Sequence, residues 1–262
     1  DNSTLYLNGD SYLQKLPSSQ GSGGDSIRYQ NVTIHNTKVT SPQVTVVDTV
    51  EIHGILNLQD GVIGTTSDHL LVLLPTASVN GGSDQSYVEG PLKKTGNTPF
   101  TFPVGQSSNY QPLSIAAPDN ITDAYTAEYF NRNPGESYDT DSRDEGLHNI
   151  SGSEYWRLDK ETGTTGVQPT IGWNSNSDCV YDLDSIRVAA WNGSQWQNYG
   201  RHSTTGTTGE GTITADSVIV YPSTILTYAN SLPHVRMDSL MDAYCEIDSN
   251  YTLYGFPQDG NG

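Results

Sequence analysis

The chain has 262 residues, 34% of them hydrophobic, and a formal net charge of −18 from 30 acidic and 12 basic residues. This length allows one or two domains with a sizeable core, and the negative charge argues against nucleic acid as a partner, because the phosphate backbone would be repelled. No apolar run approaches the roughly 20 residues that span a bilayer, so the sequence predicts no membrane span.

Residues 1–95 consist of short segments in which apolar and polar side chains alternate, which predicts strands with one inward face. The segments are 5–7, 32–34, 50–52, 56–58 and 71–73. Their spacing is uneven, with 18 residues from Val32 to Val50 and 15 from Leu56 to Leu71. We interpret the region as a β-solenoid with irregular coils, with a β-meander as the alternative. The Gly/Ser-rich cluster at 18–24 is expected to be a loop, and the opening DNSTLYL, without Met, indicates a processed or excised piece.

The stretch SYVEGPLKKTGNTPFTFPVG (86–105) marks the predicted joint between two β modules. It holds two Gly-bounded turns and two prolines, Pro91 and Pro103, which do not fit the middle of a central strand. Phe100 and Phe102 supply two of the chain's four Phe residues. We expect them to fill the space between the solenoid and the following module.

Residues 96–230 are predicted to form an antiparallel β-sandwich, because strand-like segments recur there between turns. The segments are 113–116, 124–130, 154–158, 167–173, 186–191, 195–199, 211–214 and 225–228. Asn192-Gly193, between Trp191 and Trp196, predicts a hairpin, since Asn-Gly tolerates the positive φ of a type I′ turn. The four Trp residues are expected to form the apolar centre; the alternative is an exposed platform that stacks on sugar rings, with Trp196 as the candidate.

Residues 231–262 are less regular and are interpreted as a C-terminal extension for assembly or docking, with a short helix near 236–244. The chain has two cysteines, Cys179 and Cys245. They form a disulfide if the chain is secreted, or stay as buried thiols. Neither lies in a CxxC spacing, which argues against a zinc or redox site.

The densest acidic cluster contains Asp139, Asp141, Asp144 and Glu145, followed by Gly146. Alternating carboxylates before a glycine are typical of a calcium loop, since Ca²⁺ takes several oxygen ligands from a bent backbone. A solvated acidic loop is the other interpretation, because the run is too short for an EF-hand. The six His residues are scattered, and no nucleophile elbow, P-loop or dinucleotide fingerprint is present, so we expect no enzymatic activity.

Several longer phrases resemble a segment common in large secreted proteins of Bacteroidota (flavobacteria and relatives) that use type IX secretion. The phrases are GILNLQDGVIGTT (54–66), ASVNGGSDQSYVEGPLKKTGNTPFTFPVG (77–105), TDAYTAEYF (122–130), SGSEYWRLD (151–159), WNSNSDC (173–179), SIRVAAWNGSQWQNYG (185–200) and GEGTITAD (209–216). The resemblance covers roughly residues 50 to 230. It implies an extracellular or cell-surface part built from β-solenoid and β-sandwich modules, mostly without catalysis.

The resemblance also gives meaning to five Asp-Ser/Thr-aliphatic triplets, because bacteria of this group O-glycosylate that pattern. It implies as acceptors, where they are exposed, Ser26, Thr49, Ser185, Ser217 and Ser239. Relatives often carry a Cys at the position of Ser153 that pairs with the Cys after the next Trp. Its absence here favours the pair Cys179–Cys245. The tail after Pro233 does not continue with the phrases expected of the family.

We therefore expect a non-catalytic, secreted structural or adhesive protein, a building block of a cell-surface filament, sheath or matrix. Its expected partners are further copies of itself, other cell-surface proteins and glycans. The solenoid's open end would stack on another subunit by strand addition. The alternative is a carbohydrate-binding module of a larger secreted protein, and a polysaccharide lyase or hydrolase ranks last because no acid pair is visible. Calcium is the one cofactor that the acidic cluster suggests.

Overall fold

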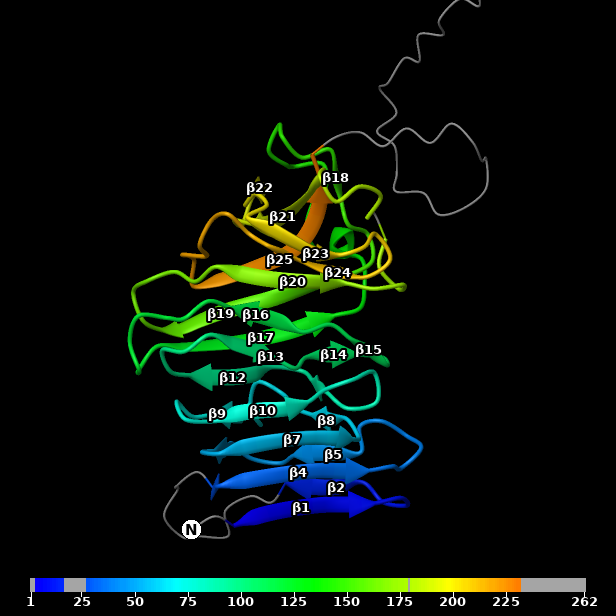
Figure 1. Ribbon diagram of the computed structural model, residues 1–262, viewed down its shortest axis with the longest axis vertical. Helices are drawn as coiled ribbons and strands as arrows, with labels where there is room; N and C mark the ends of the chain where they lie inside the picture. Colours follow the sequence, from blue (N-terminus) through cyan, green and yellow to red (C-terminus); the bar gives the residue numbers. More distant parts are fainter. Residues whose placement is uncertain (1–2, 17–26, 179, 232–262) are drawn as a thin grey trace, which may run out of the picture.

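A computed structural model describes residues 3–16, 27–178 and 180–231, and the fold is all-β. Within these residues the N-terminal part is a β-solenoid of four successive three-strand coils (Figure 1). The coils are β1 (Thr4–Gly9), β2 (Gln14–Leu16) and β3 (Ile27–Tyr29); β4 (Asn31–Asn36), β5 (Val44–Val46) and β6 (Val50–Ile52); β7 (Ile55–Asp60), β8 (Ile63–Gly64) and β9 (Leu71–Leu73); β10 (Ser78–Gly81), β11 (Val88–Glu89) and β12 (Leu92–Thr95).

Successive coils pair in parallel and form three sheets: sheet A (β1-β4-β7-β10), sheet B (β2-β5-β8-β11) and sheet C, which begins β3-β6-β9-β12. In sheet A, Leu5 pairs with Val32, Val32 with Leu56, and Leu56 with Val79, so equivalent residues are 27, 24 and 23 positions apart. This stack points into the core. The solenoid prediction is confirmed and the meander is not formed. The spacing looked uneven because Val32 lies in sheet A and Val50 in sheet C.

Above the solenoid lie antiparallel strands in two layers. Sheet D, the front layer in the described part, runs in the order β13 (Phe100–Phe102), β16 (Leu113–Ile115), β20 (Pro169–Trp173), β24 (Gly211–Thr214) and β23 (Ser203–Gly206). Sheet C continues as β17 (Ala124–Phe130), β19 (Tyr155–Thr162), β25 (Ser223–Asn230), β21 (Ile186–Trp191) and β22 (Trp196–Asn198), with β18 (Asn149–Ile150) beside β25. A hairpin, β14 (Gly105–Gln106) and β15 (Asn109–Tyr110), and one 3-10 turn, η1 (Pro134–Glu136), complete the described elements. The predicted sandwich is confirmed.

Sheet C passes from the solenoid into the sandwich without a break. Strand β12 pairs in parallel with β9 on one side and antiparallel with β17 on the other, where Leu92 faces Ala127. Val88 of sheet B likewise forms a parallel bridge with Val104. Hydrogen bonding therefore joins the two parts along two of the three solenoid sheets. The division at residues 95 and 96 stays a prediction, and the extension after 231 lies outside the described residues, as does the loop at 18–24.

Phe100 and Phe102 lie where the solenoid meets the sandwich. Both are buried, and their rings meet edge to face with centroids 4.9 Å apart. They belong to one apolar cluster that includes solenoid residues such as Val88 and sandwich residues such as Leu113. A single core therefore runs through both parts.

Lys94 fixes the turn that leads into β10. Its Nζ donates to the carbonyl oxygens of Leu74 at 2.6 Å, Thr95 at 3.0 Å and Pro75 at 3.1 Å, and the residue is 4% exposed. Burial lowers the pKa of the Lys94 ammonium to about 8. The three carbonyl acceptors explain how a lysine is accommodated in this position.

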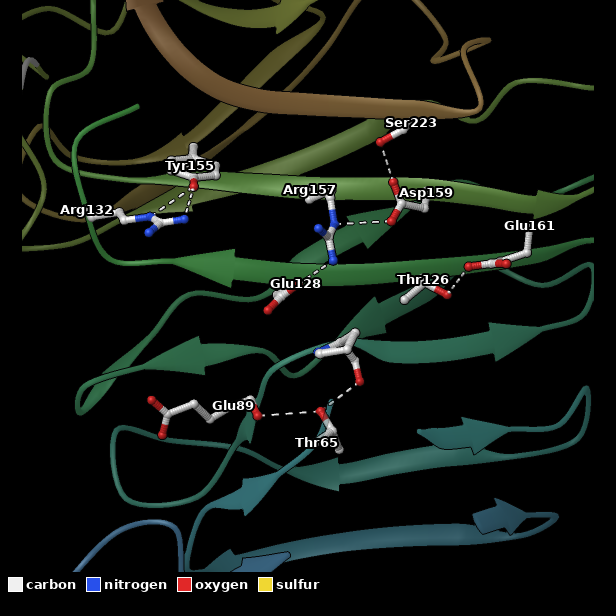
Figure 2. Close-up of polar contacts among 11 residues, drawn as sticks. Thr65, Glu89, Thr126, Glu128, Arg132, Tyr155, Arg157, Asp159, Glu161 and Ser223 are labelled. Atoms are coloured by element: carbon white, nitrogen blue, oxygen red, sulfur yellow. Dashed lines mark hydrogen bonds and ion pairs between the residues drawn. The ribbon is translucent and has the colours of Figure 1, made fainter. Parts of the chain in front are cut away.

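A row of cross-strand polar pairs lies on β17, β19 and β25 (Figure 2). Arg157 Nη2 lies 2.6 Å from Glu128 Oε2, and Arg157 Nε lies 3.2 Å from Asp159 Oδ2. Ser223 Oγ in turn donates to Asp159 at 2.5 Å. Partly exposed ion pairs of this kind contribute roughly 0–1 kcal/mol each. Their main effect is therefore on the register of the three strands rather than on stability.

The predicted hairpin at Asn192-Gly193 is formed, with Trp191 paired to Trp196. Its loop differs from a two-residue type I′ turn, because four residues (192–195) separate the strands and only Gly193, at φ 103°, has positive φ among them. Asn192 Oδ1 instead accepts from the backbone N–H groups of Ser194 and Gln195, both at 2.9 Å. The asparagine side chain organises the loop.

Candidate functional site

The carboxyl of Glu154, which precedes β19 and is 1% exposed, lies at the centre of a buried polar network in the described part. It accepts hydrogen bonds from the phenols of Tyr129 at 2.6 Å and Tyr228 at 2.7 Å, and from the hydroxyl of Ser177. The donors come from β17, from β25 and from the loop after β20. One carboxyl therefore ties together three segments that are far apart in the sequence.

Asn109 extends this network toward the solenoid. Its Nδ2 donates to the Tyr129 phenol oxygen at 2.7 Å, and its Oδ1 accepts from Asn174 Nδ2 at 2.7 Å. Asn109 follows a two-residue hairpin turn in which Ser107 and Ser108 have φ of 55° and 60°, a pair of left-handed conformations that a type I′ turn requires. The N–H of Ser108 donates to the buried Tyr87 phenol at 2.9 Å, which holds the turn in place.

Burial governs the protonation of these groups. Desolvation raises the pKa of Glu154, although the hydrogen bonds from Ser177, Tyr129 and Tyr228 act in the opposite direction. The pKa values of Tyr129 and Tyr228 are also raised, first by desolvation and then by the neighbouring Glu154 charge. Both carboxyl oxygens face hydrogen-bond donors of the chain itself. The arrangement suits a structural lock better than a general acid that must reach a substrate.

Replacing Glu154 by glutamine is expected to change how stability depends on pH. Because the folded-state pKa of Glu154 is raised, the folded chain binds more protons than the unfolded chain between the two pKa values. The free energy of unfolding of the wild type, relative to Glu154→Gln, should therefore fall as pH rises through this window and stay constant above it. The slope is at most about 1.4 kcal/mol per pH unit. Urea unfolding from pH 4 to pH 8 measures it.

The matched control is Glu210→Gln, which removes an exposed carboxyl from the turn after β23. Its unfolding free energy should run parallel to that of the wild type across the same range. If the unfolding free energy of Glu154→Gln also ran parallel to that of the wild type across this pH range, the raised pKa of Glu154 would be contradicted.

Two phrases of the sequence meet at this cluster, SGSEYWRLD (151–159) and WNSNSDC (173–179). Asp178 accepts from Ser151 Oγ at 2.7 Å, Gly152 N at 3.0 Å and Ser153 Oγ at 3.0 Å. Sequence reasoning did not identify Glu154 as a site residue, although it lies in one of the quoted phrases. Ser153 lies against Asp178, the residue before Cys179.

The carboxylates of the acidic cluster do not converge in the described structure, and calcium binding there stays a prediction. Among the residues described, no three His, Cys, Asp or Glu side chains form a group that could hold a metal ion. Asp139 accepts from Ser142 Oγ and the N–H of Asp141, and Asp141 pairs with Arg143 at 3.3 Å. Glu145 is exposed in the same loop. The carboxylates thus bind local donors instead of converging.

Asp144 has a different role in the same loop, since it attaches the loop to β22. Its Oδ1 accepts from Gln195 Nε2 and its Oδ2 from Asn198 N, both at 2.8 Å. The backbone of Ser142 and Asp144 also exchanges hydrogen bonds with Trp196 at 2.8 Å. This pairing extends the sheet beyond β22 by a short bridge. The interpretation of the acidic segment as a freely solvated loop is therefore incomplete, because Asp144 and the backbone attach this segment to β22.

The prediction that Trp196 stacks on glycans is wrong for this structure. Trp196 is 0% exposed, Trp156 0% and Trp173 2%, whereas Trp191 is half-buried. Trp196 packs with Trp191 at a ring distance of 5.6 Å and with Tyr138 at 6.1 Å. The loop carrying Asp144 lies over the hairpin, which explains why a residue beside the hairpin tip is buried. The four Trp residues do not form one centre, since Trp156 and Trp173 belong to the large apolar cluster, whereas Trp196, with Trp191 packed against it, belongs to a second, smaller one.

The residues implied as O-glycosylation acceptors differ in accessibility. Ser217 is exposed and Thr49 is half-buried. Ser185 is 5% exposed, and its hydroxyl donates to Asp182 O at 3.0 Å, so it does not meet the exposure that the expectation required. Ser26, Ser239 and both cysteines of the predicted pair, Cys179 and Cys245, lie outside the described residues, as does the short helix predicted near 236–244.

In the portion of the chain that the structure describes, no helix is long and apolar enough to cross a membrane. Comparisons with family models, curated proteins and solved structures found no match to the chain.

Proposed function

We propose that the chain is a non-catalytic structural or adhesive building block of an extracellular or cell-surface filament, sheath or matrix. The observation that carries this proposal is the unbroken sheet C, whose hydrogen-bonded strands run from β3 in the first coil to β22 in the sandwich (Figure 1). A sheet that crosses from one part to the next resists bending between them. Such continuity suits a rigid spacer, and it would be superfluous in a pair of independently moving domains.

Two further features support a structural role. The carboxyl of Glu154 is buried and bonded to the chain's own donors. The Trp residue that the carbohydrate-binding alternative depends on, Trp196, is buried too. The formal charge of −18 keeps the lateral surface soluble and opposes unspecific association.

Immunogold electron microscopy of intact source cells and their secreted material tests this proposal. An antibody against the purified chain should label extended or layered structures outside the cell, and labelling should disappear when the antibody is first saturated with the purified chain. Label confined to the cell interior would contradict the proposal. A measured hydrolytic or lyase activity of the purified chain on polysaccharides, lost in a folded variant, would contradict its non-catalytic part.

A further inference from the structure

A groove of about 730 Å³ lies between two strands that each end a sheet. One wall is β10, the last strand of sheet A, and the other is β13, the first strand of sheet D. Sheet C passes across this level through the β12–β17 pair, whereas β10 and β13 are not paired with each other. The groove therefore lies between the end strands of sheets A and D.

The edge of β10 presents free backbone groups to the groove. In a parallel pair, alternate residues direct both N–H and C=O to the same neighbour. Ser78 N donates to Gly54 O at 2.9 Å, which directs Ser78 toward the preceding coil. The N–H and C=O of the next residue, Val79, consequently point away from that coil, toward the groove that Val79 lines.

The same alternation applies to β13. Ala116, directly after β16, donates its N–H to Gln168 O at 2.9 Å. The backbone N–H and C=O of Ala116, and those of Ser114 two residues earlier, therefore point toward β20. The backbone groups of Ile115, which lies between Ser114 and Ala116, point toward β13, where Ile115 pairs with Phe100. The N–H and C=O of Thr101 must then lie on the opposite edge of β13, which is the groove side. Both walls thus offer strand hydrogen-bonding groups to one occupant.

The groove is uncharged, and its lining is partly apolar. Its floor and walls include Val79, Phe100, Tyr110 and Ile121, and none of the described residues that line it carries a charge. Ile121 is 59% exposed. The Tyr110 ring, which lines the groove, also packs closely against Gly82, where φ is 112°. Val79 is the last side chain in the inward stack of sheet A. A strand added beside β10 would place an apolar side chain next to Val79.

We propose that residues 250–256 of this chain, NYTLYGF, bind in the groove as an added β-strand. The 31 residues after Ser231 contain one uncharged stretch, 249–258, in a chain of net charge −18. Tyr251 and Leu253 lie two positions apart and share one face of an extended strand, as the open stack requires. Residues 232–249 span up to about 60 Å when extended, so segment 250–256 can bind at a site tens of ångströms from the end of β25.

Hydrogen exchange of the full chain tests this binding. Amides in 250–256 should exchange at least about tenfold more slowly than those of the same sequence as a free peptide, because strand pairing removes them from water. Protection should be lost in Leu253→Asp, which places a charge in the apolar stack. It should also be lost in Ile121→Arg, which places one on the groove wall, and in Thr101→Pro, which removes the N–H that β13 offers.

Matched controls separate binding from general damage. Asn261→Asp adds the same charge to the tail outside the segment, and Val39→Arg adds a positive charge at a solenoid position that is 95% exposed. Both should keep wild-type protection. Exchange of 250–256 at the rate of the free peptide overturns the proposal, and so does protection that survives both groove variants. Protection that falls on dilution shows a segment supplied by a neighbouring chain, and constant protection shows one supplied by the same chain; either supports binding in the groove.

This inference does not depend on the proposed structural function. A purely intramolecular strand would complete the fold of a single rod, and a strand from a neighbour would join two rods. The exchange experiment reports on the groove and the microscopy on location, so each can fail without the other.

Discussion

Replacing Phe102 by alanine is expected to lower the free energy of unfolding of the whole chain by about 3–5 kcal/mol. Phe102 is fully buried, and it meets Phe100 edge to face in the apolar cluster that contains both solenoid and sandwich residues. Removing the ring leaves a cavity that the surrounding strands cannot close, because β13 is fixed by its pairing with β16. The loss should therefore be felt on both sides of the junction.

Two probes distinguish a shared loss from a local one. All four Trp residues follow residue 155, so Trp fluorescence reports on the sandwich, whereas far-ultraviolet circular dichroism reports on every strand. In urea, the two signals should change at one midpoint in the wild type and at one lower midpoint in Phe102→Ala. The control is Thr101→Ala, at an exposed position of the same strand, with a change within about 0.5 kcal/mol. A fluorescence midpoint that does not move in Phe102→Ala would show that the core is not shared.

Local patterns predicted several strands of the sandwich with their bounds. The segments 124–130, 186–191 and 211–214 have the bounds of β17, β21 and β24. The same patterns predicted the assembly of strands into sheets less well, since adjacent segments such as 32–34 and 50–52 enter different sheets of one coil. Short strands such as β13 and β23 were missed, because three or four residues with at most two apolar side chains carry little periodicity.

The Glu154 network illustrates what local patterns do not contain. Its members Asn109, Tyr129, Ser177 and Tyr228 come from four segments, and each segment alone is an ordinary mixture of polar and apolar residues. Only the register between β17, β19 and β25 brings them together. The acidic cluster at 139–145 shows the converse. The carboxylates are adjacent in sequence, yet the backbone turns each toward a different donor, as with Asp144 and Asn198.

A proline at Ala127 is expected to destabilise the chain by at least about 3 kcal/mol, since the residue lies in a central strand of sheet C. Ala127 is 0% exposed and is paired with Leu92 of β12 on one side and Leu158 of β19 on the other. Proline removes the N–H that one of these strands needs, and its ring fixes φ in a strand held from both sides. This is the place where the solenoid's sheet passes into the sandwich, so the same change also tests the continuity on which the proposed function rests.

The two probes should respond to Ala127→Pro differently from their response to Phe102→Ala. With the β12–β17 pairing interrupted, the solenoid and the sandwich lose their shared sheet, and the single transition should separate into two, with fluorescence following the sandwich alone. Thr101→Pro is the matched control, because the Thr101 N–H faces the groove, so a proline there removes no hydrogen bond between β13 and β16 and can release only the added strand proposed for the groove. It should retain one transition. If Ala127→Pro also retained one transition with an unchanged midpoint, sheet C would not be what makes the two parts a single rigid unit.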